Sequence, residues 1–249
     1  MKHFILIHGA WEESRIWDEV TPVLEAQGHT VTALDLPGHG TNHQPISEVS
    51  MASYVRYLVD TIESFDHPVV LVGHSMAGSV ISQVAEQIPV RIERPIYVAA
   101  FLIEDGSSVL EAMQSDEEGQ LLPRIVFSAD QSYATVPEKA LLEVGFHDVN
   151  ERTIRRVLPR MIEKQATEPF MAKVALSQLN FGSVPKSYVR TTIDRVTSPL
   201  LQDRLIANWQ VDQVINLESG HFPAFSLPKE LAESLAELAL FNERELASV

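Results

Sequence analysis

The sequence predicts an α/β fold: a mainly parallel six-stranded sheet with helices on both faces and an inserted helical cap. Two observations predict it. Short apolar segments alternate with longer segments in which apolar residues recur at helical spacing, and this alternation is typical of parallel sheets. The alternation stops between about residues 104 and 182, a stretch too long to be a loop in a compact domain.

Six segments are predicted to be strands, because they are short, rich in valine and isoleucine, and often bounded by Gly, Pro or Asp. They are Phe4–Ile7, Thr30–Leu34, Val69–Val72, Pro95–Ala100, Ser187–Thr191 and Gln213–Leu217. The segments with helical spacing are Trp17–Gln27, Met51–Phe65, Met76–Ile88, Leu201–Trp209 and a last one from about Pro228 to about Phe241. A proline suits the first position of a helix, where its missing N–H would have no partner.

The chain divides into a core and an insertion. Residues 1–104 and 183–249 form the predicted core, which a chain of 249 residues can build as one large domain. Residues 105–182 hold several helical patterns, few strand-like runs and prolines at positions 123, 137, 159 and 169. We therefore expect them to form a mostly helical cap inserted between two core strands.

Charge and composition exclude several classes of function. The net charge is −15, from 19 basic and 34 acidic residues, so nucleic acid and anionic membranes are not expected as partners. The chain has no cysteine, and therefore no disulfide or thiolate metal site. No apolar segment is long enough to span a membrane, and the four apolar residues near the start are too few for a signal peptide, so a cytoplasmic protein is expected.

The segment VVLVGHSMAGSVI, residues 69–81, has the pattern of a nucleophile elbow. A buried strand leads through Gly-His-Ser-Met-Ala-Gly into a helix, and this order places Ser75 at the sharp turn between them. The positions two before and two after the serine must be small, and they are Gly73 and Ala77. Helix capping by Ser75 is the alternative, but a cap needs neither small neighbours nor a preceding buried strand. Ser75 is thus the predicted nucleophile.

A serine nucleophile needs a base and an acid that orients the base. His221 follows the last predicted strand by four residues and precedes the apolar run FPAF, which suggests a pocket wall. Asp194 follows the preceding strand, and the order Ser, Asp, His matches a common arrangement in α/β enzymes. The rival acids are Asp105 and Glu104, which follow another strand end. We expect Asp194 to be the acid.

The other histidines have less distinctive surroundings. His74, beside the nucleophile, is expected to point away from the turn and to pack in the core. His8 is expected to shape the turn after the first strand, and His39 to serve the structure of a glycine-rich loop. The sequence contains no metal-ligand spacing and no phosphate loop, so neither a metal nor a nucleotide cofactor is expected.

Acyl transfer also needs two N–H donors for the oxyanion of the tetrahedral intermediate. The main-chain N–H of Met76, which follows the nucleophile, is expected to be one of them. The other should come from the loop after the first strand, from Gly9 or Ala10. We expect Ala10 to donate, while Gly9 lets the main chain bend close to the substrate.

The motifs HGAW, DLPGHG, GHSMAG, TTIDR and SGHF, in this order, resemble the α/β-hydrolase superfamily over essentially the whole chain. The length and the helical cap are more narrowly similar to the hydroxynitrile lyase and methylesterase family, which includes plant methyl salicylate and methyl jasmonate esterases and bacterial esterases. The resemblance implies an α/β-hydrolase fold. It also implies a triad of Ser75, Asp194 and His221, with Ala10 and Met76 as oxyanion donors. It is compatible with a homodimer, since members of the family often pair through the cap side.

Two departures from the lyase pattern favour ester hydrolysis. Lyases of this family carry a threonine where this chain has Gly9, and a lysine that stabilises the leaving cyanide where this chain has Phe222. A neutral aromatic ring cannot stabilise an anion as an ammonium group does. The resemblance therefore implies a serine hydrolase that cleaves a small hydrophobic or aromatic carboxylic ester through an acyl-enzyme. The alternatives are cyanohydrin cleavage and a ligand-binding receptor with a residual triad; lactones and thioesters stay open as substrates.

The substrate pocket is expected to include Gly9, Trp11 and Phe222, with the cap as its roof. Further candidates for its apolar lining, each of which could instead pack inside the cap, are Phe101, Leu121, Leu122, Phe127, Phe146 and Phe181.

Overall fold

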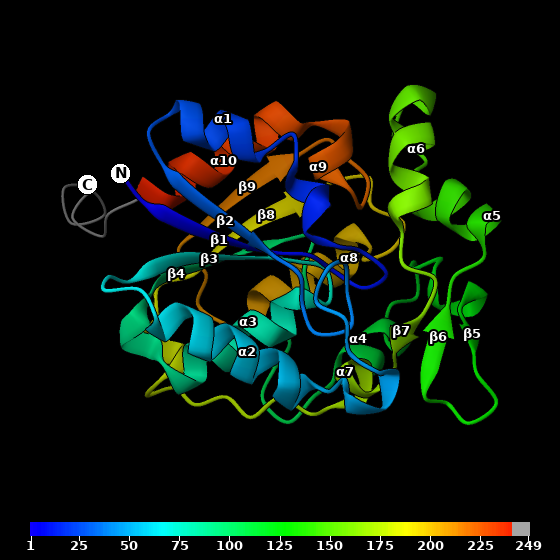
Figure 1. Cartoon of the computed structure of the whole chain (residues 1–249), viewed down its shortest axis with the longest axis horizontal. Helices are drawn as coiled ribbons and strands as arrows, with labels where there is room; N and C mark the ends of the chain where they lie inside the picture. The colour runs from blue at the N-terminus through cyan, green and yellow to red at the C-terminus, as the bar shows by residue number, and fades with distance from the viewer. Residues whose placement is uncertain (241–249) are drawn as a thin grey trace.

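The computed structural model of the protein describes residues 1–240 (Figure 1). The six predicted strands form one sheet, in which every neighbouring pair is parallel. In the order β2-β1-β3-β4-β8-β9, they are Thr30–Leu34, His3–Ile7, Val69–His74, Ile92–Val98, Ser187–Thr191 and Gln213–Leu217. The predicted fold class is confirmed. The main difference is that β4 begins three residues before the predicted start and ends two residues before the predicted end.

Five core helices lie where the apolar spacing predicted them: α1 (Thr21–Ala26), α2 (Met51–Glu63), α3 (Ala77–Gln87), α8 (Pro199–Ala207) and α10 (Pro228–Leu240). The short helix α9 (Pro223–Ser226) is not among the predicted ones. Of the first predicted helix, Trp17–Gln27, only α1 is helical, with Pro22 near its start, and a 3₁₀ turn, Ser14–Trp17, ends where the predicted helix begins. Proline lacks the N–H that a helix interior needs, so it is favoured in the first turn of a helix. The predicted end of the last helix at Phe241 lies outside the described residues.

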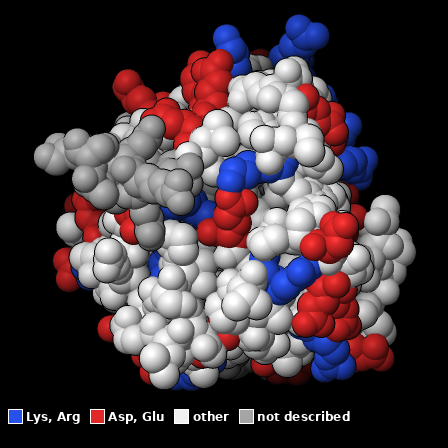
Figure 2. Space-filling model, turned by 90° about the vertical axis from the view of Figure 1, so that its left-hand side faces the viewer, with Lys and Arg blue, Asp and Glu red and all other residues white. Residues whose placement is uncertain are grey.

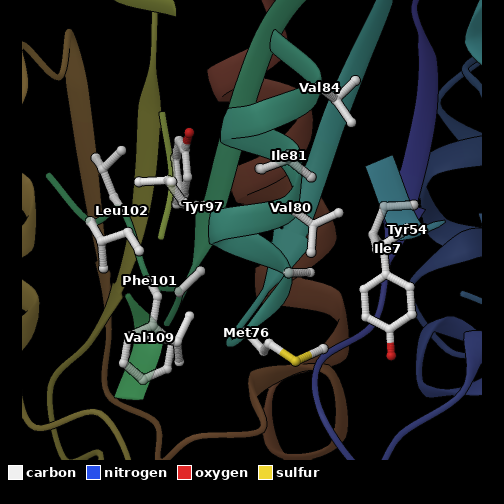
Figure 3. Close-up of a cluster of buried hydrophobic side chains, with 14 of the residues drawn as sticks. Ile7, Tyr54, Met76, Val80, Ile81, Val84, Tyr97, Phe101, Leu102 and Val109 are labelled. Atoms are coloured by element: carbon white, nitrogen blue, oxygen red, sulfur yellow. The ribbon is translucent and has the colours of Figure 1, made fainter. Parts of the chain in front are cut away.

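Side chains alternate between the two faces of the sheet, and each face packs against its own helices. Phe4, Leu6, Val70 and Val72 belong to one buried cluster, which includes α10. Residues at the alternate positions, such as Ile5, Ile7 and Leu71, belong to the other cluster, with α2 and α3. Figure 1 shows α1 and α10 above the sheet and α2 and α3 below it. Figure 3 shows the second cluster, with the apolar side chains of α3 between those from neighbouring elements.

The segment between β4 and β8 forms a separate layer, drawn on the right and below the sheet in Figure 1. Its helices are α4 (Val109–Gln114), α5 (Glu138–Ala140), α6 (Glu151–Val157) and α7 (Glu168–Met171). It also contains a three-stranded antiparallel sheet, β5-β6-β7, made of Val126–Phe127, Tyr133–Thr135 and Gln165–Ala166. The helices agree with the expected helical insertion, and the small sheet is an element that the sequence did not predict. Strands of two or three residues are too short to show an alternating pattern in the sequence.

Short helical turns complete the described chain. They are the 3₁₀ turns Ile46–Glu48, Pro89–Arg91, Leu122–Arg124, Leu158–Arg160 and Phe181–Ser183, and a π-helical turn at Leu141–Gly145.

None of the helices in residues 1–240 has the length and apolar character needed to cross a membrane. In the same part of the chain, no group of three or more His, Asp or Glu side chains is arranged to hold a metal ion. Figure 2 shows the face at the left of Figure 1, near the chain ends, where acidic and basic side chains are interspersed.

Candidate active site

Ser75 lies at the apex of the turn between β3 and α3. Its φ angle is +53°, in the left-handed region, which costs a residue with a side chain about 1–3 kcal/mol. The end of β4 holds this strained turn. The N–H of Ser75 donates to the carbonyl of Val98 at 3.2 Å, and its carbonyl accepts from the N–H of Phe101 at 3.0 Å. These hydrogen bonds fix the direction in which the serine side chain leaves the main chain.

The glycines around Ser75 are required by close contacts. A Cβ atom at Gly73 would lie 2.9 Å from Ile81 Cδ1 and 3.0 Å from the carbonyl oxygen of Ala77. A Cβ atom at Gly78 would lie 2.7 Å from the main-chain nitrogen of Phe101. The tight turn from strand to helix, which the sequence pattern predicted, therefore requires glycine at these two positions.

Ser75, His221 and Asp194 form a continuous chain of hydrogen bonds. His221 Nε2 lies 2.9 Å from Ser75 Oγ, and His221 Nδ1 lies 2.8 Å from Asp194 Oδ2. The three side chains come from the loops after β3, β9 and β8. They meet because the carboxyl ends of parallel strands share one edge of the sheet. All three residues are buried.

The Asp194 carboxylate is held by its own loop. Oδ1 accepts from the N–H groups of Val196, at 2.7 Å, and Thr197, at 3.1 Å, while Oδ2 also accepts from Thr191 Oγ1 at 3.0 Å. The rival Asp105 instead accepts from the N–H of Leu176 at 2.8 Å. The structure thus brings Asp194, and not Asp105, to the histidine.

The two expected oxyanion donors lie on either side of the nucleophile. Ala10 lines the same cavity as Ser75, and Met76 follows it in the chain. The N–H of Gly9 is already used, because it donates to Glu12 Oε2 at 2.6 Å. The N–H groups of Ala10 and Met76 have no hydrogen-bond acceptor within residues 1–240. Of the two positions that the sequence left open, Ala10 is therefore the one with a free donor.

Glu12 is a buried carboxylate beside the nucleophile that the sequence analysis missed. Its Oε2 lies 3.0 Å from Nδ1 of His74, whose Nε2 lies 2.8 Å from the carbonyl oxygen of His221. Burial raises the pKa of Glu12, but the charge and hydrogen bond of His74, the Gly9 N–H and the charge of His8 together lower it by more, so the net shift is downward. The sequence indicates only that His74, a polar residue at the end of a buried strand, needs a polar partner, and does not indicate which residue that partner is. His74 therefore does more than pack in the core.

Unlike His74, His8 and His39 form their hydrogen bonds as neutral rings. Nδ1 of His8 faces the carbonyl of Gly9 at 2.8 Å, and its Nε2 accepts from the N–H of Leu36 at 3.1 Å. Nδ1 of His39 faces the carbonyl of Glu12 at 2.8 Å, while its Nε2 lies 2.9 Å from the Tyr54 hydroxyl. Burial lowers the pKa of both rings, that of His39 to about 3. Both histidines thus connect the turn after β1 to neighbouring segments.

An apolar cavity opens onto Ser75 and His221 under the inserted segment. Besides Ala10 and Gly145, its apolar lining consists of Trp11, Phe101, Met113, Leu121, Leu141, Met161, Phe170, Val196 and Phe222. Its polar lining consists of Glu12, Ser75 and His221, so no lysine or arginine lies among the described lining residues. Trp11, Phe222, Phe101 and Leu121 thus line the cavity as expected.

The remaining pocket candidates lie elsewhere. Leu122 and Phe127 line a neighbouring apolar cavity. Phe146 packs against Phe222, with ring centres 4.8 Å apart, and Phe181 packs against Trp209 at 4.7 Å. Gly9 is close to the nucleophile, since a Cβ atom there would lie 2.9 Å from Ser75 Cβ.

The inserted segment is hydrogen-bonded to the loops that carry the site. The Ile162 N–H donates to the Trp11 carbonyl at 2.8 Å, next to Ala10. Asp116 accepts from Ser198 in the loop of Asp194, and Asp148 accepts from the N–H of Gly220, beside His221, at 2.6 Å. Each of these loops is therefore positioned in part by the insertion.

The alpha/beta hydrolase family matches residues 4–234. The chain is 31% identical to methylesterase 8 of Arabidopsis thaliana, over 96% of this chain and 89% of that one. It is 29% identical to the alpha-hydroxynitrile lyase of the same plant, over 95% and 96% of the two chains.

A crystal structure of a pyrethroid hydrolase from Sphingobium faniae JZ-2 superimposes with a TM-score of 0.85 at 27% identity, covering 96% of this chain and 97% of that one. Some relatives are longer: the chain spans 64% of the length of chloroplastic methylesterase 11 of Arabidopsis thaliana. The order of the strands, the turn at Ser75 and these similarities agree, and the chain belongs to the alpha/beta hydrolase family, with the plant methylesterases and hydroxynitrile lyase among its relatives.

Proposed function

We propose that the protein is a carboxylic ester hydrolase that works through an acyl-enzyme on Ser75. The observation that supports this most directly is the unbroken chain of hydrogen bonds from Ser75 Oγ through His221 to Asp194. The family and the names of the relatives, which include methylesterases and a pyrethroid hydrolase, point to the same chemistry.

In the first half of the proposed reaction, His221 Nε2 takes the proton of Ser75 Oγ as this oxygen attacks the ester carbonyl carbon. The N–H groups of Ala10 and Met76 stabilise the oxyanion. The carbon–oxygen bond to the alcohol then breaks, and His221 gives its proton to the leaving alcohol. Asp194 keeps the proton of the neutral ring on Nδ1 and stabilises the charged ring that forms.

In the second half, a water molecule attacks the acyl-enzyme while His221 takes its proton. The bond to Ser75 Oγ breaks, the serine regains its proton from His221, and the carboxylic acid leaves. The proposed reaction uses the side chains of Ser75, His221 and Asp194 and the N–H groups of Ala10 and Met76. It consumes one water molecule for each ester cleaved.

The lining of the cavity indicates the class of ester. Nearly all of its side chains are apolar or aromatic, so we propose a small hydrophobic or aromatic ester without charge. Phe222 stands beside His221 where a cation would be needed for a leaving cyanide, with ring centres 5.2 Å apart. Cyanohydrin cleavage is therefore the less favoured alternative, although a lyase is among the relatives.

We also propose that residues 105–182 act as the cap of the site, with residues 1–104 and 183–249 as the core. The cap supplies Met113, Leu121 and Phe170 to the cavity. The cytoplasmic location and the homodimer stay predictions, and several relatives are described as chloroplastic.

The test is hydrolysis of a short-chain nitrophenyl ester by the wild type and by Ser75→Ala. Loss of a triad member costs about 10⁴–10⁶-fold in kcat, so the variant should be almost inactive. Ser82→Ala is the matched control. Ser82 is buried, as Ser75 is, but it lies within α3 and bonds to the Gly78 carbonyl and the Tyr97 hydroxyl. A Ser75→Ala variant with most of the wild-type activity would contradict the proposal. Release of cyanide from mandelonitrile, with no ester cleaved, would favour the lyase instead.

A further inference from the structure

Glu12 and His74 form a buried pair directly behind the nucleophile, and the triad reaction does not use it. The side chain of His74 is 3% exposed and that of Glu12 is 1% exposed. Glu12 comes from the loop after β1, and His74 is the last residue of β3, immediately before Ser75. The pair therefore connects the two loops that hold the expected oxyanion donors.

The hydrogen bonds of His74 define its protonation state. Nε2 faces the main-chain carbonyl oxygen of His221 at 2.8 Å, and a carbonyl can only accept, so Nε2 carries a proton. Nδ1 faces Glu12 Oε2, which already accepts from the N–H of Gly9. Both nitrogens of His74 thus face acceptors, which is the arrangement of an imidazolium beside an ionised Glu12.

The electrostatics agree with this arrangement. Burial lowers the pKa of His74, but the charge of Glu12, the hydrogen bond to it and the carbonyl of His221 raise it by more, so the net shift is upward. Asp194 acts in the same direction. The nearest other titratable rings are His221, with ring centres 4.8 Å from His74, and His8.

The pair holds main-chain groups on both sides of Ser75. Glu12 Oε2 binds the Gly9 N–H at 2.6 Å and so orients the peptide that precedes the Ala10 N–H. His74 Nε2 binds the carbonyl of His221 and so fixes the main chain that carries the base. We propose that the Glu12–His74 ion pair is a positioning device that aims the Ala10 N–H at the oxyanion and keeps His221 in reach of Ser75. The proposal rests on the proposed ester hydrolysis.

Oxyanion donors act mainly in the transition state, so a misplaced donor lowers kcat more than it raises KM. Glu12→Ala removes both the charge and the acceptor for the Gly9 N–H. We expect it to lower kcat by about 10²-fold or more, in the range for the loss of one oxyanion donor, with KM changing by less than about threefold. Glu12→Gln keeps a side-chain oxygen for the Gly9 N–H and should recover part of the loss.

The control is Asp212→Asn, which disrupts another ion pair, between a buried arginine and a partly buried aspartate. Asp212 Oδ2 lies 3.1 Å from Arg94 Nη1, next to the start of β9 and away from the strand ends that carry the triad. Both variants should lower Tm, but only Glu12→Ala should lower kcat, measured per active site by titration with a fluorophosphonate. A Glu12→Ala variant with reduced Tm and the kcat of the wild type would overturn the proposal. If Glu12→Ala does not fold, the Glu12→Gln variant decides: the full kcat of the wild type together with a neutral His74 would overturn the proposal.

A second measurement does not depend on the substrate. Nitrogen-15 NMR of histidine-labelled protein, with His74 assigned through His74→Gln, reports whether each ring nitrogen carries a proton. We expect His74 to be doubly protonated at pH 7 in the wild type and neutral in Glu12→Gln. A charged His74 in a wild type that cleaves no ester would contradict the proposed function alone. A neutral His74 in a protein that does cleave esters would contradict the positioning role alone.

Discussion

At the scale of single residues, Gly9 shows how a missing methyl group leaves room at the nucleophile. A Cβ atom at this position would lie 2.9 Å from Ser75 Cβ and 3.2 Å from Glu12 Oε1. One of these groups must then move. Ser75 is the proposed nucleophile, and Glu12 holds the Gly9 N–H beside it. We expect Gly9→Ala to lower kcat/KM for a nitrophenyl ester by roughly 10²-fold, the effect of a displacement of about 1 Å.

Gly28→Ala is the control for that substitution. Gly28 has φ +84° and lies before β2, with no atom within 4 Å of an added Cβ. An alanine there should cost about 1–2 kcal/mol of stability, because the left-handed conformation is strained for it, and should leave kcat/KM unchanged. Equal loss of activity in the two variants would show that lowered stability, and not crowding of Ser75, explains the effect.

Asp194 is the residue whose role the sequence left most open. Because Asp194 holds Nδ1–H of His221, Asp194→Asn offers that nitrogen an amide and destabilises the required tautomer. We expect kcat to fall by about 10⁴-fold without loss of the fold. Asp105→Asn is the matched variant of the rival acid and should keep wild-type kcat, since Asp105 bonds to the N–H of Leu176. The reverse result in steady-state kinetics would reassign the acid.

At the scale of elements, the start of α3 depends on its contact with the chain after β4. A Cβ atom at Gly78 would lie 2.7 Å from the nitrogen of Phe101 and 2.9 Å from its carbonyl oxygen, and main-chain atoms cannot rotate away. We expect Gly78→Ala to destabilise the fold by about 1–3 kcal/mol through overcrowding. It should also lower kcat, because α3 begins next to the Met76 N–H. Urea unfolding and kinetics of the same preparation test this, and an unchanged midpoint would contradict it.

Most elements of the core could be predicted because they are long or strongly apolar segments. Strands such as β1 and β3 are buried on both faces, and α2 and α10 each present several buried apolar residues at helical spacing. The small sheet β5-β6-β7 could not be predicted in this way. Its strands have two or three residues, and β5 is exposed, so no apolar pattern marks them.

Part of the candidate site could likewise be predicted from the sequence, and part could not. Ser75, Asp194 and His221 follow strands that the sequence identifies, so their meeting at one edge of the sheet could be predicted. Glu12 could not, because it stands beside Glu13 in an acidic run and its partner His74 is 62 residues away. A contact of that kind depends on the path of the loop after β1, which no local pattern encodes.

At the scale of the whole molecule, buried histidines make stability depend on pH in two opposite ways. The pKa of His39 is lowered to about 3 by burial, so the unfolded chain takes up a proton near pH 6.5 while the folded protein does not. Its contribution is complete above pH 6.5 and is lost as the pH falls toward 3. The pKa of His74 is raised, so its contribution is complete below pH 6.5 and is lost as the pH rises through the raised pKa.

Net charge adds a third effect that must be separated from these. The protein carries −15 at pH 7 and has a pI of about 5.0, so acidification toward pH 5 removes repulsion between acidic groups and favours the compact state. The pH profile of the wild type alone therefore cannot reveal the histidine contribution. Comparison with a variant that lacks one histidine and keeps the surface charge can reveal this contribution.

His39→Asn is such a variant, since a side-chain amide can replace the Nδ1 donor to the Glu12 carbonyl. The titratable groups that act on the pKa of His39 are His8 and Asp35, and both are kept. Each pH unit between the two pKa values is worth about 1.4 kcal/mol, so between pH 6.5 and 5 the wild type should lose about 2 kcal/mol more unfolding free energy than the variant. The measurement is urea unfolding of both proteins at pH 7.5, 6.5 and 5. Parallel losses in the two would show that burial does not lower the pKa of His39 in the folded protein.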